Sequence, residues 1–122
     1  MNNARLVVDA YVVDTLMADL VGRDRRPSAF LVYLYLWGRR RLSKEGRAEV
    51  SLQHIAAGTG LSKSAVQGAI RLLLRRRLVR AEHASPTAVP AYFVERPWKR
   101  RPKGLSPRAP AAATTRPRGR RG

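Results

Sequence analysis

Side chains that can hydrogen-bond to the edges of nucleic-acid bases recur at helical spacing in the middle of the chain. They are Lys63, Ser64, Gln67 and Arg71, and Gly68 lies on the same face. Spacings of three and four residues place such side chains on one face of an α-helix. Gln67 can form two hydrogen bonds with adenine, Lys63 can donate to the acceptors of guanine, and Gly68 leaves room for a close approach of the backbone. We therefore expect these five residues to read base edges in the major groove.

The other side of this segment is apolar and predicts a helix over residues 62–77. The expected buried stripe is Val66, Ala69, Ile70, Leu73 and Leu74. A shorter helix is expected to begin after Ser51, and Ser51 and Ser62 are suited to cap the two helices. Gly60 can adopt the left-handed conformation that a tight turn between them requires. Two helices joined in this way are typical of a helix-turn-helix, whose second helix enters the major groove.

Hydroxyl and guanidinium groups at the ends of these helices are candidates for phosphate contacts. The expected phosphate contacts are Ser51, Ser62, Arg75, Arg76 and Arg77. Residues 78–82 and 91–94 have the composition of strands, and the intervening residues 83–90 include two prolines, so a β-hairpin is expected after the second helix.

Residues 51–79 read SLQHIAAGTGLSKSAVQGAIRLLLRRRLV. This pattern, followed by a hairpin, resembles the winged helix-turn-helix regulators of bacteria of the MarR and GntR type, and it is similar to the DNA-binding domains of plasmid replication initiators and DnaD-like proteins. The resemblance covers about residues 28–95 and implies a mainly α fold with a small β-hairpin. It also implies DNA contacts at Ser62, Lys63, Ser64, Gln67 and Arg71, with wing contacts at Arg80, Ser85 and Thr87. Arg77 stands where those families usually have a glycine.

Upstream of this unit, residues 6–13 are rich in β-branched side chains and predict an extended piece, followed by a helix from Asp14 that Gly22 closes. Ser28 is expected to cap a helix over residues 29–41 that is apolar nearly all round. Such a helix is typical of the centre of a core. A homodimer formed through its second apolar face is the alternative.

The positive charge of the chain has two locations. The formal net charge is +17 on 122 residues, and residues 1–26 are neutral. Residues 27–96 hold twelve basic and four acidic side chains, whereas residues 97–122 hold nine basic side chains, no acidic one and five of the eight prolines. We therefore expect an N-terminal segment at 1–27, a DNA-binding domain at 28–96 and a disordered basic tail at 97–122.

The tail is expected to contact DNA through its basic side chains. They are Lys99, Arg100, Arg101, Lys103, Arg116, Arg118 and Arg120. The segment from Arg116 to Arg120 partly resembles the AT-hook, which lies in the minor groove of A·T-rich DNA. A generic basic extension is the simpler interpretation.

Other classes of function find little support in the residues. There is no cysteine, only two histidines occur, and no nucleophile motif or phosphate-binding loop is complete, so we expect neither an enzyme nor a metal or other cofactor. The longest apolar run, residues 29–37, is too short to span a membrane, and a cytoplasmic, nucleoid-associated protein is expected. No small-molecule effector site is evident. The leading hypothesis is a sequence-specific regulator of transcription that binds double-stranded DNA, and the alternatives are a replication or mobile-element maintenance protein and an RNA-binding or ribosome-associated protein.

Overall fold

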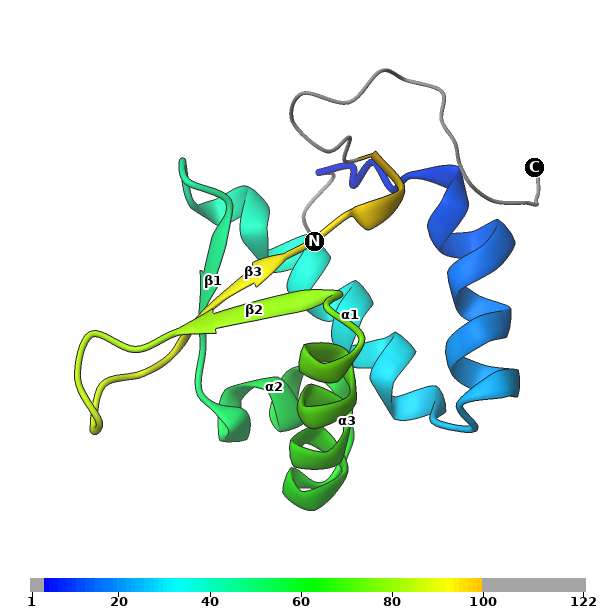
Figure 1. Cartoon of the computed structure of the whole chain (residues 1–122). Helices are drawn as coiled ribbons and strands as arrows, with labels where there is room; N and C mark the ends of the chain where they lie inside the picture. The colour runs from blue at the N-terminus through cyan, green and yellow to red at the C-terminus, as the bar shows by residue number, and fades with distance from the viewer. Residues whose placement is uncertain (1–3, 100–122) are drawn as a thin grey trace, which may run out of the picture.

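The computed structural model describes residues 4–99. In this part the chain is mainly helical and carries a small three-stranded antiparallel sheet, an arrangement compatible with a winged-helix shape (Figure 1). The elements are the π-helical turns η1 (Val12–Leu16) and η2 (Asp19–Arg23), α1 (Pro27–Arg39), the 3-10 turn η3 (Arg40–Leu42), β1 (Arg47–Glu49), α2 (Leu52–Thr59), α3 (Lys63–Arg75), β2 (Val79–Glu82), β3 (Ala91–Val94) and the 3-10 turn η4 (Pro97–Lys99).

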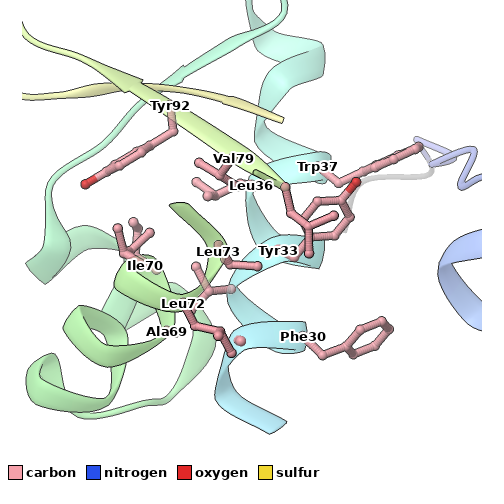
Figure 2. Close-up of a cluster of buried hydrophobic side chains, with 14 of the residues drawn as sticks. Phe30, Tyr33, Leu36, Trp37, Ala69, Ile70, Leu72, Leu73, Val79 and Tyr92 are labelled. Atoms are coloured by element: carbon pink, nitrogen blue, oxygen red, sulfur yellow. The ribbon is translucent and has the colours of Figure 1, made fainter. Parts of the chain in front are cut away.

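Helix α1 is the central core element, as expected. Its side chains Tyr33 and Leu36 lie toward those of α3 and the sheet, whereas Phe30 and Trp37 point to the other side, toward the N-terminal segment (Figure 2). The predicted cap at Ser28 is wrong: Arg26 is the N-cap residue and Pro27 opens the first turn. Proline suits this place because its fixed φ is helical and its missing N–H would have had no partner there.

The chain upstream of α1 differs from the expected extended piece. Residues 10–23 are helical throughout, including the β-branched Val12 and Val13. Val12, Leu16 and Leu20 recur every four residues and are all buried. Burial of this stripe outweighs the β propensity of branched side chains. The helix ends at Arg23, one residue beyond the predicted Gly22, and Arg25 rather than a glycine takes the left-handed φ of 54°.

This N-terminal helix packs against α1 on a side that α3 leaves open (Figure 1). The second apolar face of α1, which suggested a dimer partner, is therefore covered by the same chain. Leu31, 45% exposed, is the large apolar side chain that α1 leaves most open. A homodimer through residues 29–41 remains a prediction that would have to use this narrow surface.

The expected hairpin is present, and it has a third strand. Strands β2 and β3 pair with Val79 opposite Val94 and Glu82 opposite Ala91, and the chain between them is the predicted loop 83–90. Strand β1 pairs with the other edge of β3, so the order in the sheet is β1-β3-β2. The pairing of β1 with β3 joins residues that are more than forty positions apart in the sequence.

Long-range hydrogen bonds tie the two ends of the described chain to the core. Tyr33 donates its hydroxyl to the carbonyl of Glu95 at 2.9 Å, and burial raises the pKa of this phenol, which keeps it a donor. Trp98 donates Nε1 to Asp9 Oδ2 at 3.0 Å and stacks on Tyr11 with ring centroids 4.5 Å apart. The prediction of disorder from residue 97 onward is therefore wrong for residues 97–99, because Trp98 has aromatic and acidic partners in the N-terminal segment.

Candidate nucleic-acid interface

The N-caps of α2 and α3 and the turn between the two helices use the three residues expected there. Ser51 Oγ accepts the N–H of His54 at 3.0 Å, and Ser62 Oγ accepts the N–H of Ala65 at 3.1 Å. Gly60 ends α2 with a left-handed φ of 80°, where a side chain would be strained. Both predicted caps are confirmed. Their hydroxyl protons stay available to donate to a phosphate, because capping uses the oxygen as an acceptor.

Helix α2 is held by a close contact with α1. Gly58 lies in the last turn of α2. A Cβ at this position would lie 2.4 Å from Cε1 of Tyr35 in α1, so the tyrosine ring occupies the space of a side chain. Ile55 is fully buried one turn earlier. These contacts set the position of α2 and, through the turn, that of α3.

Helix α3 exposes the polar side chains that were predicted to read bases. Lys63, Ser64, Gln67 and Arg71 are exposed, as is Arg75 farther along the helix. The buried side is wider than the predicted stripe, because α1 covers Leu72 as well (Figure 2). Leu74, expected inside, is 39% exposed. The exposed face is thus continuous from the first turn of α3 to its last.

Gly68 was predicted to belong to the base-reading set, and the structure contradicts this prediction. It is buried, because the guanidinium of Arg26 covers it, and a Cβ at this position would lie 2.5 Å from Arg26 Nη1. The room that the glycine leaves is used by this arginine and not by a ligand. Arg26 itself is exposed and brings a cation beside α3 that the sequence analysis missed. No local pattern marks it, because Arg26 lies in the polar break before α1.

The arginines at the end of α3 have different environments. Arg76 forms an ion pair with Asp24, and both side chains are largely shielded from solvent, so this guanidinium ties α3 to the N-terminal segment. Its predicted role as a phosphate contact conflicts with that pairing. Arg77 is exposed and has a left-handed φ of 58°. Leu78 N–H bonds to Leu73 O at 2.9 Å and Arg77 N–H to Leu74 O at 3.1 Å, which is a Schellman motif with arginine in the place of glycine.

Replacing Arg77 with glycine is expected to raise the free energy of unfolding by about 1 kcal/mol, because a left-handed conformation strains an L side chain by about that amount. Arg77→Ala is the matched control, since it removes the same charge but retains a Cβ. Chemical denaturation of the three proteins measures the difference. Equal stability of the glycine and alanine variants would contradict the strain.

The predicted wing residues lie in strand β2 and in the loop of the hairpin. Arg80 lies in β2, where it pairs with Glu82 and Glu95 and stacks over Phe93 with its guanidinium carbon 4.2 Å from the ring centroid. Ser85 and Thr87 are exposed in the loop that extends beyond the strands (Figure 1). The loop side chains are accessible to a ligand, whereas the charge of Arg80 is partly neutralised within the sheet.

The formal charge on α2 and α3 has one sign. The sequence holds no Asp or Glu between Glu49 and Glu82. The basic side chains in that span are Lys63, Arg71, Arg75, Arg76, Arg77 and Arg80. A pocket of about 460 Å³ lies between the end of α3 and β2, and both Arg77 and Arg80 line it. Glu95 lines it too and pairs with Arg80, so the positive charge is concentrated on α3 and is partly neutralised at the hairpin. The surface therefore attracts polyanions.

Within residues 4–99, no group of three or more His, Cys, Asp or Glu side chains is placed to hold a metal ion. No helix in the same residues is long and apolar enough to cross a membrane. The predicted tail contacts from Arg100 to Arg120 lie outside the described residues. Comparisons of the chain with models of protein families, with curated proteins and with solved structures give no match.

Proposed function

We propose that this protein is a winged helix-turn-helix DNA-binding protein that reads a specific sequence of double-stranded DNA. The observation that carries the proposal is the exposed face of α3, where Lys63, Ser64, Gln67 and Arg71 lie together without an acidic neighbour on α2 or α3. The order α1-β1-α2-α3 followed by a hairpin supports it, since this is the order of winged-helix proteins. We infer that the protein regulates transcription through this binding, which would place it on the nucleoid.

Each part of the surface has a proposed role. The first turns of α3 enter the major groove, where Gln67 and Lys63 contact base edges. Arg75 and Arg77 hold phosphates at the end of the helix, and Arg26 adds a contact that lies beside Gly68. Other phosphate contacts come from the capping hydroxyls and from the hairpin loop. These backbone contacts fix the register in which the base-reading side chains meet the groove.

Selection of bound duplexes from a random pool tests the proposal. We expect enrichment of one defined motif, because the polar face of α3 offers side chains that discriminate between base pairs. If two copies bind together, the motif will have two half-sites about one helical turn, or roughly 34–36 Å, apart. A pool that shows no enrichment after repeated rounds, while every duplex is retained equally, would argue for unspecific binding of phosphates alone.

A further inference from the structure

A second basic surface lies at the corner between the end of α1 and the start of β1. We call it the basic corner and define it by the four cationic side chains that line one pocket of about 290 Å³. They are Arg5, Arg40, Arg41 and Lys44. All the lining residues come from two stretches of chain, residues 5–7 and 37–46. Among the described residues no Asp or Glu belongs to the lining. An uncompensated cluster of this kind attracts phosphate groups.

Contacts with the core hold the walls of this pocket in place. The guanidinium carbon of Arg40 lies 4.3 Å from the ring centroid of Trp37, and Arg41 Nη1 donates to the carbonyl of Gly38 at 2.6 Å. On the opposite wall, the carbonyl of Val7 accepts a hydrogen bond from Trp37 Nε1 at 2.8 Å. Because Arg40 is held against Trp37 before a ligand binds, an anion that contacts it immobilises less side-chain freedom than it would at a mobile arginine.

The position of the basic corner separates it from the surface of the proposed DNA contact. Figure 1 places the turn between η3 and β1 at the opposite end of the molecule from the first turn of α3. A straight duplex that lies along α3 therefore does not reach the corner. A ligand at the basic corner is therefore separate from the duplex that α3 contacts.

Two observations favour a nucleic-acid backbone as the occupant. Arg5, Arg41 and Lys44 are exposed, so the pocket is open to a long polymer and not closed around a small ligand. Trp98 contacts Asp9, so the described chain ends close to the N-terminal segment that forms one wall of the pocket. The sequence that continues from there, residues 100–122, has eight basic side chains and no acidic one. Positive charge therefore continues from this end of the molecule along the chain.

We propose that the basic corner binds the phosphate backbone of a second DNA duplex, so that one chain bridges two DNA segments. The inference rests on the proposed function for the first duplex and adds a separate surface for the second. A protein held on DNA by α3 meets neighbouring segments of the same polymer at high effective concentration. Modest phosphate contacts at the corner are sufficient under that condition.

The test measures capture of a fluorescent duplex by beads that carry a second duplex, using the full-length protein. Binding to a single duplex is measured in parallel by fluorescence anisotropy. The corner variant is Arg41→Glu with Lys44→Glu. The control variant is Arg23→Glu with Arg25→Glu, which changes the net charge equally at two exposed residues outside the pocket. We expect the corner variant to capture about tenfold less fluorescent duplex than the wild type and to bind a single duplex within about twofold of it. The control variant should retain its ratio of capture to single-duplex binding.

Each other outcome identifies which proposal fails. Wild-type protein that binds a single duplex but captures no second one overturns the bridging inference and leaves the proposed function intact. Equal capture by the wild type and the corner variant also overturns it, and it would assign bridging to a dimer or to the tail. A parallel loss of single-duplex binding in the corner variant would make the corner part of the first interface. Absence of binding to any duplex overturns both proposals.

Discussion

Replacement of Trp37 with alanine is expected to lower the free energy of unfolding by about 3–5 kcal/mol, the usual effect of removing a large aromatic side chain from a core. Trp37 is 1% exposed and its ring centroid lies 6.0 Å from that of Tyr33. Its Nε1 also donates to the carbonyl of Val7, so the side chain joins α1 to the N-terminal segment. A loss of this size is a large part of the total stability of a small domain, roughly 5–15 kcal/mol. Denaturation in urea, followed by circular dichroism, measures it.

Two variants separate the contributions of this side chain. Trp37→Phe retains most of the apolar contact but loses the donor to Val7, so it should be destabilised by about 0.5–1.5 kcal/mol, the net contribution of one hydrogen bond whose acceptor lies in an exposed residue. Trp98→Ala removes the other tryptophan, which is only partly buried and lies at the edge of the core. It should cost clearly less than Trp37→Ala. Equal losses for the two alanine variants would contradict the central role that the structure gives to Trp37.

Features that depend on a few neighbouring residues could be predicted from the sequence. The capping serines Ser51 and Ser62 act on donors three residues ahead, and the left-handed Gly60 is a property of its own backbone. The polar face of α3 follows from helical periodicity alone. The order of α2, α3 and the hairpin could also be predicted, because the composition and the boundaries of each element are local features of the sequence.

Features that depend on contacts between distant segments could not be predicted in this way. The β-branched Val12 and Val13 favour a strand locally, and their helix forms because Val12, Leu16 and Leu20 are buried together in the core. Nothing in the three residues of β1 specifies that this strand pairs with β3.

Charge pairing was the other source of error in the candidate site. Counting the arginines of residues 75–77 treats them as equivalent, whereas Arg76 is bound by Asp24 from a segment more than fifty residues away. Gly68 was misplaced for a similar reason, since the group that covers it belongs to Arg26. The predicted base-reading side chains Lys63, Ser64, Gln67 and Arg71 are exposed as expected, because no distant segment of the described chain packs over them.

The face of α3 leads to the second large effect, which concerns specificity. Gln67→Ala is expected to weaken binding to the selected duplex by about tenfold to a hundredfold, because a bidentate contact contributes about 1–3 kcal/mol of discrimination between bases. Binding to a random duplex should change by less than about threefold, since unspecific affinity comes from phosphates. Lys63→Ala should behave similarly at another position of the motif. Anisotropy titrations on both duplexes at one salt concentration give the comparison.

Arg75→Ala is the matched control for these variants, because Arg75 is exposed on the same helix but lies at its C-terminal end. As a phosphate contact it should weaken binding to the selected and the random duplex by the same factor, and it should reduce the slope of log K against log salt by about 1. Gln67→Ala should leave that slope unchanged, since an uncharged side chain displaces no counterion. If Gln67→Ala instead weakened both duplexes equally, α3 would hold the DNA backbone without reading its sequence.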